Sequence, residues 1–511
     1  MRRLIPYCAH FTTQARVSED TGCDARRANE ERRRSVIDED IGKVGAKTLY
    51  RPDLLYHRGR FRRDAGLLVG ENGRVTEIVD APQTSECKIV CLPGKALLPG
   101  FINAHSHSFQ RLIRGRAESR RVSGPDFWSW RETMYQAAAH LDPEGVYDVA
   151  RMAFLEMALA GTTTVGEFHY LHNAPDGRPY DDPNLLSRKI IDAARSVGLR
   201  VVLLRGAYQR SGYEVPANRG QIRFFESTGT FLENVASLLA EFPADSEGVR
   251  IGVAPHSIRA VPLEDLCEIV FWGRERKLPI HMHVAEQLGE VLACKREYGY
   301  SPLELLERQN LIDSNFTAVH AIHMSLEEIG ILAAAKGTIC SCPTAERNLG
   351  DGVLAADEVA RRRIPIALGS DSHSQIDPLE DARGLDYHLR LTRRQRVILD
   401  EIHDQELSAR LFECATTSGA KSLMIPGGEL KVGFPADFFT VDLSDPCIAG
   451  NSPDDLLSLI VFSLTRSAIS EVAVGGRLLV RDHSHSEQEE IISRYLKTYQ
   501  RVWLKEGLPI Q

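Results

Sequence analysis

The chain has 511 residues, 43% of them hydrophobic and 26% charged, a composition typical of globular proteins that bury a large core. A formal net charge of −8 at pH 7 argues against a nucleic-acid partner, which would need a basic surface. The longest apolar stretch, 456–464, is too short to cross a bilayer and predicts a core helix, so we expect no membrane association. The ten cysteines lack regular spacing, which favours buried, reduced thiols and a cytoplasmic location.

The first 45 residues differ from the rest of the chain. They are rich in arginine and show little apolar periodicity, which predicts a disordered tail over 1–45. Arg2, Arg3 and Arg16 precede the first acid, Glu19, a pattern that also occurs in organelle-targeting peptides. An organelle-targeting N-terminus therefore stays open as the alternative to a cytoplasmic location.

Two β-rich segments flank the middle of the chain. Within 46–96, two strand-like runs between 67 and 79 surround Asn72-Gly73, a strong signal for a hairpin. Strand-like runs with glycine-containing turns return over 426–486. We expect these two segments to form one small β-sandwich, followed by a C-terminal helix within 487–511.

Between these segments, residues 97–425 alternate strand-like runs with helical patterns. Over 143–160, for example, apolar side chains recur at helical spacing between the helix start Asp142-Pro143 and the helix stop Gly161. Eight strand candidates can be placed, namely 97–104, 162–167, 200–205, 250–255, 279–284, 317–320, 338–341 and 365–370. Eight successive βα units predict an α/β fold, a (β/α)8 TIM barrel, whose active site lies at the C-terminal ends of the strands.

Candidate metal ligands stand at the ends of three of these strands. His105 and His107 are two residues apart and point to one side of an extended chain. His283 and Asp371 end two other strands, and we assign His283 rather than His281 because Glu286 follows it at three residues. Three imidazoles and one carboxylate suit a single divalent ion with a position left for water. Zinc is preferred, although iron or manganese would accept the same set.

Three residues are predicted to carry the chemistry around this ion. Glu286 lies within reach of the same water and is the predicted proton shuttle. His320 ends the next strand and is expected to orient the attacking water together with Asp371.

The further pair His483 and His485 has no carboxylate at metal spacing, so we expect it in a solvated loop.

The order of these motifs resembles the amidohydrolase superfamily, and within it the mononuclear deaminases. The segment 253–256 offers no lysine of the kind that bridges two metals in the binuclear members. Longer stretches are similar to the formimidoylglutamate deiminase family, namely 104–110, 127–132, 167–170, 254–260, 319–321, 348–352 and 369–373. The resemblance covers roughly 48–505. It implies hydrolysis of N-formimino-L-glutamate to N-formyl-L-glutamate and ammonia, a step of histidine degradation.

The substrate that this resemblance implies carries two carboxylates, so its pocket needs fixed cations. Arginine can bind a carboxylate through two hydrogen bonds. The candidate substrate-binding residues are Gln110, Arg131, Tyr170, His256, Arg259 and Ser370. The chain departs from the family pattern at Ser108, Ala345, Arg347, Ser374 and Gln375, which bears on fine specificity more than on the reaction.

Two other functions stay open. A deaminase of guanine or of an adenosine derivative would use the same metal ligands but would not need two arginines beside the pocket. A non-catalytic relative kept as a scaffold should have lost ligands, whereas all four are present here together with Glu286. The family analogy also raises a homodimer, on which the sequence is silent.

Overall fold

The computed structural model describes residues 47–80, 87–119, 127–216, 218–244, 248–400, 402–450 and 452–504. The predicted tail over 1–45 and the alternative of a targeting peptide lie outside these residues. Within them, no helix combines the length and the apolarity needed to cross a membrane.

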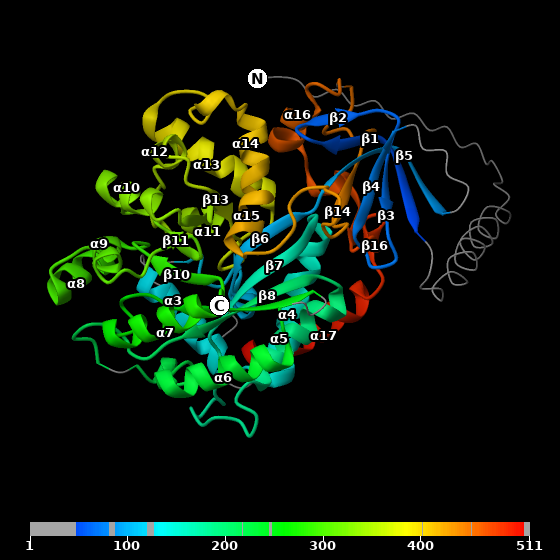
Figure 1. The fold of residues 1–511 in the computed structure, drawn as a ribbon. Helices are drawn as coiled ribbons and strands as arrows, with labels where there is room; N and C mark the ends of the chain where they lie inside the picture. The colour runs from blue at the N-terminus through cyan, green and yellow to red at the C-terminus, as the bar shows by residue number, and fades with distance from the viewer. Residues whose placement is uncertain are drawn as a thin grey trace, which may run out of the picture. The chain divides into compact units, whose positions relative to one another are not determined.

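Eight parallel strands form the predicted barrel, which is confirmed (Figure 1). The strands pair in chain order, and they are β6 (Phe101–Ser106), β7 (Thr162–His169), β8 (Arg200–Ala207), β9 (Val249–Pro255), β10 (Ile280–Val284), β11 (Phe316–His320), β12 (Thr338–Ser341) and β13 (Ile366–Leu368). A bridge between Ser106 and Asp371 brings the first and last strands together at their C-terminal ends. The barrel is therefore closed next to the candidate metal ligands.

The first predicted strand, 97–104, is wrong in its first half. Residues 97–99 belong to β5 (Lys88–Pro99) of the flanking sheet, where Leu97 pairs with Leu55 and Thr440. Gly100 separates β5 from β6, and a Cβ atom there would lie 2.3 Å from the side chain of Thr163. Only glycine fits at this crossing, where one apolar run passes from one sheet to the other.

Helices follow the barrel strands as the βα pattern requires. The predicted helix over 143–160 is α4 (Pro143–Leu159), and the Asp142 side chain caps it by accepting a hydrogen bond from the Gly145 amide. The other helices are α3 (Phe127–Ala139), α5 (Leu185–Val197), α6 (Thr228–Glu241), α7 (Leu263–Glu275), α8 (Leu288–Tyr298), α9 (Pro302–Arg308), α10 (Leu326–Ala334), α11 (Pro343–Leu349), α12 (Ala356–Arg361), α13 (Pro378–Arg393), α14 (Leu407–Cys414), α15 (Thr417–Ser422), α16 (Leu456–Ser463) and α17 (Gln488–Trp503). Short 3₁₀ turns lie at η1 (Ser108–Ile113), η2 (Arg219–Gln221), η3 (Ile402–Asp404) and η4 (Arg466–Ala468).

The β-layer beside the barrel joins both predicted β segments in one mixed sheet of nine strands. Its order is β17-β16-β15-β14-β5-β1-β3-β4, with β2 (Arg60–Arg62) paired to β1 (Thr48–His57). The remaining strands are β3 (Ala65–Val69), β4 (Val75–Asp80), β14 (Phe438–Asp442), β15 (Ile469–Val474), β16 (Arg477–Arg481) and β17 (Ser484–His485).

The two ends of this sheet meet at glycine turns. The predicted hairpin is β3–β4, and a Cβ atom at Gly73 in its turn would lie 2.8 Å from the carbonyl oxygen of Gly475. The hydroxyl of Tyr50 also donates to the carbonyl of Gly476. Contact between the distant ends lets the sheet enclose its own apolar core, which includes Phe438 and Leu67.

The C-terminal helix α17 is tied to the barrel by charge as well as by packing. Arg501 bonds to Asp142, the cap of α4, through both terminal nitrogens at 2.6 and 2.7 Å. The indole of Trp503 donates to the carbonyl of Leu112 in η1 at 3.1 Å. Because η1 begins directly after His107, the C-terminal helix supports the segment that carries a candidate ligand.

Two smaller expectations are corrected. His485 is buried in β17 and contacts the carbonyl of Val197 at 3.1 Å, so it does not lie in a solvated loop. The cysteines within the described residues are free thiols, as expected, but Cys91 is exposed and Cys87 is half-buried. Cys87 precedes β5 and Cys91 lies in its first half, where most side chains are exposed or half-buried.

Candidate metal centre and adjoining cavity

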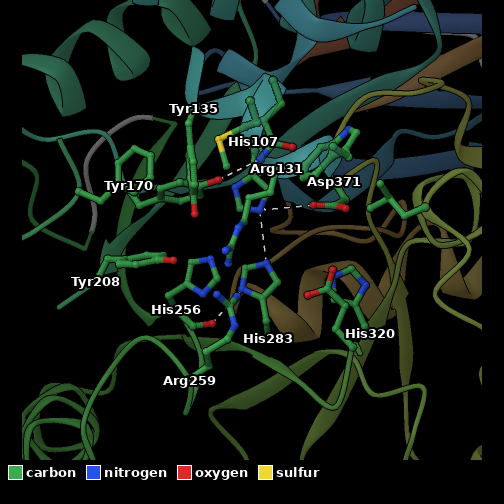
Figure 2. Close-up of a pocket in the computed structure, with 16 residues that line it drawn as sticks. His107, Arg131, Tyr135, Tyr170, Tyr208, His256, Arg259, His283, His320 and Asp371 are labelled. Carbon is green, nitrogen blue, oxygen red and sulfur yellow. Dashed lines mark hydrogen bonds and ion pairs between the residues drawn. The ribbon is translucent and has the colours of Figure 1, made fainter. Parts of the chain in front are cut away.

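Three histidines and one aspartate converge at the C-terminal end of the barrel. The Nε2 atom of His107 lies 3.1 Å from that of His105 and 3.3 Å from that of His283. The Oδ1 atom of Asp371 is 3.4 Å from the Nε2 atoms of both His105 and His107. All four side chains are buried, and their ligand atoms lie within 4.8 Å of one another. Figure 2 shows His107, His283 and Asp371 facing the same point.

The opposite ring nitrogens of two of these histidines are fixed by backbone carbonyls. The Nδ1 atom of His107 donates to the Phe168 carbonyl at 2.8 Å, and that of His283 to the His256 carbonyl at 2.9 Å. Burial lowers the pKa of His107 and His283 below the usual value, so each ring is neutral with its proton on Nδ1. Their Nε2 atoms then face each other as two acceptors, which repel unless a cation lies between them. The donor set therefore fits a divalent metal.

The backbone at the ends of the strands is held in an uncommon conformation. The φ angle is +68° at His320, +57° at Ala321 and +45° at Asp371, in the left-handed region that costs non-glycine residues about 1–3 kcal/mol each. Hydrogen bonds hold Asp371 there, because its amide donates to the His105 carbonyl and its carbonyl accepts from the His107 amide. Backbone strain at His320 and Asp371 is consistent with a functional site, because such strain is usually kept where it orients functional side chains.

A buried carboxylate that the sequence analysis did not assign supports the ligand segment from behind. Glu167, in β7, accepts hydrogen bonds from the Ser106 hydroxyl at 2.5 Å and from the amide and hydroxyl of Ser108 at 2.7 and 2.6 Å. Burial raises the pKa of Glu167 to about 7. Ser108 departs from the family pattern, and its hydroxyl holds Glu167 in place. Glu167 lies near the end of the second barrel strand, and this position is the signal that could have identified it.

Glu286 and His320 lie next to the candidate ligands and interact with each other. The Nε2 atom of His320 is 4.0 Å from a carboxylate oxygen of Glu286, and its Nδ1 atom is 3.3 Å from Glu346. Burial would lower the pKa of His320, but the two carboxylates raise it well above the usual value, which favours the imidazolium. Burial raises the pKa of Glu286 above its usual value, so this carboxylate takes up a proton more readily than one in water. No sequence motif points to Glu346, which lies near His320 only through the fold.

A cavity with about 470 Å³ of empty space, part of it open to solvent, adjoins the four candidate ligands. The cavity brings together predicted catalytic and substrate-binding residues, and among those lining it are Gln110, Arg131, Tyr170, His256, Arg259, Glu286, His320 and Asp371. Three aromatic residues that the sequence did not single out, Tyr135, Tyr208 and Phe224, also line it.

The two predicted arginines enter the cavity from different elements. Arg131 lies in α3, with its guanidinium carbon 5.5 Å from the ring centre of Tyr135 one helical turn later. Arg259 follows β9, and its backbone carbonyl accepts a hydrogen bond from Arg210 at 3.1 Å. Burial would lower the pKa of Arg259, but the adjacent Tyr208 and Glu290 raise it, so it remains a cation. Figure 2 shows both guanidinium groups directed toward the space beside His256 and His283.

The neutral polar residues of the cavity are held by bonds to their neighbours. Gln110 donates to the Tyr170 hydroxyl at 2.9 Å, and the ring of His256 stacks on that of His283 with centres 4.6 Å apart. Ser370 is the exception among the predicted substrate-binding residues. Its hydroxyl accepts from Asn103 at 2.7 Å, and it does not line the cavity. The Ser370 amide also donates to the Asn103 side-chain oxygen at 3.1 Å, so Ser370 ties the last barrel strand to the first.

Comparison with known proteins agrees with this geometry. The chain matches the amidohydrolase family over residues 96–479. It is 36% identical over 397 residues to a formimidoylglutamate deiminase from Pseudomonas aeruginosa, covering 78% of this chain and 87% of that protein. It is 26% identical over 448 residues to a 5-methylthioadenosine/S-adenosylhomocysteine deaminase from Pyrococcus abyssi, covering 87% and 96% respectively.

Solved structures show the same architecture. An amidohydrolase from Brucella melitensis superposes with a TM-score of 0.80 at 31% identity, covering 90% of this chain and 100% of that chain. An adenosine deaminase from Xanthomonas campestris with bound zinc has a TM-score of 0.76 at 21% identity, covering 89% and 98%, and supports the fold alone. The resemblance drawn from the sequence motifs is thereby confirmed: this chain belongs to the amidohydrolase family.

Proposed function

We propose that this protein hydrolyses N-formimino-L-glutamate to N-formyl-L-glutamate and ammonia, and so acts in histidine degradation. The observation that carries the proposal is that two arginines, Arg131 and Arg259, share one cavity with Glu286 and the candidate metal ligands. A dicarboxylate substrate supplies two anionic groups for two buried cations. The 36% identity to a protein named formimidoylglutamate deiminase supports the same substrate.

The cofactor of this reaction is one divalent ion, zinc by preference, that His105, His107, His283 and Asp371 would hold. When bound, such an ion lowers the pKa of a water molecule to about 7 and so supplies a nucleophile at neutral pH. Iron or manganese would accept the same ligands, and the preference for zinc rests on the three imidazoles with a single carboxylate.

The protein's own residues move the protons. Water adds to the C=N bond of the formimino group, and Glu286 accepts a proton from the water. Glu286 then delivers this proton to the terminal nitrogen, which becomes an amino group of the tetrahedral intermediate. When the bond between that nitrogen and carbon breaks, Glu286 takes the remaining hydroxyl proton of the intermediate and passes it to the departing nitrogen, so that the C=O bond forms and ammonia leaves. The formyl group remains on the glutamate nitrogen. His320, held as a cation by Glu286 and Glu346, donates a hydrogen bond to the attacking oxygen, and Asp371 helps to orient it.

The remaining cavity residues recognise the two carboxylates. Each guanidinium can pair with one carboxylate, and the side chains of Gln110, Tyr170 and His256 supply further hydrogen bonds. Because these groups are buried, their interactions with an anion are screened less than at the surface.

A small, water-soluble substrate also agrees with the cytoplasmic location expected from the sequence, and a homodimer remains a proposal by family analogy.

A second candidate substrate is an adenine nucleoside derivative. The rings of Tyr135, Tyr170, Tyr208 and Phe224 line the cavity and could stack on a purine, and relatives such as that from Pyrococcus abyssi carry the name of such a deaminase. A neutral purine brings no carboxylate that Arg131 and Arg259 could bind, whereas a dicarboxylate brings two. The dicarboxylate is therefore the better match.

The experiment that tests the proposal identifies the products. The metal-loaded protein is incubated with N-formimino-L-glutamate, and the products are identified by NMR together with an assay for ammonia. We expect ammonia and N-formyl-L-glutamate in equal amounts. Formamide and glutamate would show cleavage of the other C–N bond, and the absence of any product would rule out this substrate.

A further inference from the structure

The loop after β8 places a buried glutamine behind two of the cavity tyrosines. The side-chain amide of Gln221, in η2, donates one hydrogen bond to the Tyr208 hydroxyl at 2.6 Å and another to the Tyr135 hydroxyl at 2.7 Å. Gln221 is 0% exposed and does not itself line the cavity. Figure 2 shows the hydroxyl groups of Tyr135 and Tyr208 directed into the cavity, on the side that Arg131 enters.

The orientation of this amide follows from the groups at its other end. The Asn218 amide donates to the Ser211 hydroxyl oxygen at 3.0 Å, so the hydroxyl proton of Ser211 is available for the Gln221 Oε1 atom, 2.5 Å away. The amide oxygen therefore faces Ser211, and the NH₂ group faces the two phenols. The loop is also locked to α3, because a Cβ atom at Gly220 would lie 2.8 Å from the Tyr135 ring.

This arrangement sets the polarity of both tyrosines. Each phenol oxygen accepts a hydrogen bond from Gln221, so each phenol keeps its own proton to donate. Only one of the two protons can lie between the two phenols, so at least one is presented to the cavity. Burial raises the pKa of Tyr135 above the usual range, and the neighbouring Tyr208 raises it further, so this phenol stays protonated.

We propose that Gln221 is a positioning residue that fixes Tyr135 and Tyr208 as hydrogen-bond donors to a carboxylate of the substrate. The inference rests on the proposed function, because that substrate supplies the carboxylate. A carboxylate only accepts hydrogen bonds, so phenols beside Arg131 that have protons to donate match it. Gln221 acts through the tyrosines and touches neither the substrate nor the metal ligands.

The first test reverses the polarity of the network. In Gln221→Glu a carboxylate accepts the protons of both phenols and turns them away from the cavity. We expect the KM for N-formimino-L-glutamate to rise roughly 10-fold to 100-fold, the range for hydrogen bonds to charged groups, with kcat changed less than about threefold. The matched control is Gln209→Glu, which adds the same charge in the same loop, where Gln209 bonds to Thr228 outside the cavity. Its KM should stay within about threefold of the wild-type value.

The second test separates positioning from a merely structural role. Gln221→Met removes both donors and should raise KM roughly 3-fold to 10-fold, as expected for neutral hydrogen bonds. In a Tyr135→Phe/Tyr208→Phe background, the same substitution should change KM less than about twofold, because the groups through which Gln221 acts are gone. An equal factor in both backgrounds would overturn the proposal.

A binding measurement keeps this inference separable from the proposed function. Titration calorimetry with N-formyl-L-glutamate reports carboxylate recognition without turnover, and Gln221→Glu should weaken its binding by the same 10-fold to 100-fold. Binding with this loss but no turnover by the wild type would contradict the proposed function and retain the role of Gln221. Turnover with KM and binding unchanged in Gln221→Glu would retain the function and overturn the role. Neither turnover nor binding by the wild type would overturn both.

Discussion

The flanking sheet and the C-terminal end of the barrel bury opposite kinds of side chain. The core of the sheet contains Phe438 and Leu97, both 0% exposed, whereas the end of the barrel buries Glu286, His320 and Asp371. Buried apolar groups stabilise a fold, while buried charges cost free energy unless they are paired. The left-handed backbone at His320 and Asp371 adds to this cost. The apolar cores of the sheet and the barrel therefore offset the free energy that the buried charges and strained backbone of the site cost.

The difference between the two regions predicts which substitutions change chemistry and which change stability. The largest effect is expected for a metal ligand. His283→Gln should lose the bound ion and bring activity to the detection limit, because it removes one of three imidazoles. The matched control is His281→Gln, two residues earlier on the same strand, where His281 contacts the Ser422 carbonyl at 3.0 Å and lies outside the ligand cluster. Elemental analysis should find about one ion per chain in the wild type and in the control. Two ions per wild-type chain would contradict the four-ligand site.

The next largest effect concerns the proton shuttle. Glu286→Gln keeps the shape of the side chain but removes its proton chemistry, so kcat should fall by about 10²–10⁴-fold with the metal retained. Glu290→Gln makes the same change four residues later, in α8, at a carboxyl that does not line the cavity and whose pKa burial raises to about 7. We expect that control to lose less than about tenfold. Similar losses in both variants would remove Glu286 from its proposed role.

A smaller loss is expected when one substrate cation is removed. Arg259→Met should lower kcat/KM for N-formimino-L-glutamate by roughly 30-fold to several thousand-fold, which corresponds to about 2–5 kcal/mol for an unpaired buried charge. Arg131→Met should behave similarly, and neither should change the metal content. Arg250→Met serves as the control, because Arg250 lies near the other end of β9 and bonds to the Lys277 carbonyl. Steady-state kinetics that are unchanged in both cavity variants would reopen the choice of substrate.

The smallest effect on activity is expected from the flanking sheet. Phe438→Ala removes a fully buried ring that packs edge-on against Tyr50 with centres 4.9 Å apart. The free energy of unfolding should fall by about 3–5 kcal/mol, while kcat/KM stays within about twofold where the protein is folded. Denaturant unfolding and kinetics on the same samples measure both. A large loss of kcat/KM without loss of stability would show that the sheet takes part in the chemistry.

Most of the barrel could be predicted from the sequence, because each βα unit leaves a local pattern of apolar and turn residues. Apolar runs ended by turn residues located the eight strands, and the motifs at their ends named side chains that the structure brings together. The break between β5 and β6 at Gly100 could not be predicted, because one continuous apolar run contributes strands to two sheets. Apolar residues alone do not indicate which sheet a strand joins.

Residues that work through long-range contacts could not be found in this way. Gln221 meets Tyr135 across 86 positions and His485 meets Val197 across 288, and neither pair leaves a local pattern. Glu346, in α11, lies 26 positions from His320, and the two side chains meet only in the folded chain. Ser370 shows the reverse error, since proximity to Asp371 in the sequence did not place its hydroxyl in the cavity.

The central claim is that a metal-dependent centre and a cavity for a dicarboxylate form one active site. The most direct test compares kcat/KM for ammonia release from N-formimino-L-glutamate, guanine and S-adenosylhomocysteine, using the same metal-loaded protein. We expect N-formimino-L-glutamate to be preferred by at least about 30-fold, the lower limit expected when one charge pair between the protein and its substrate is lost. A preference for either purine substrate would contradict a dicarboxylate site and assign the two arginines to another role.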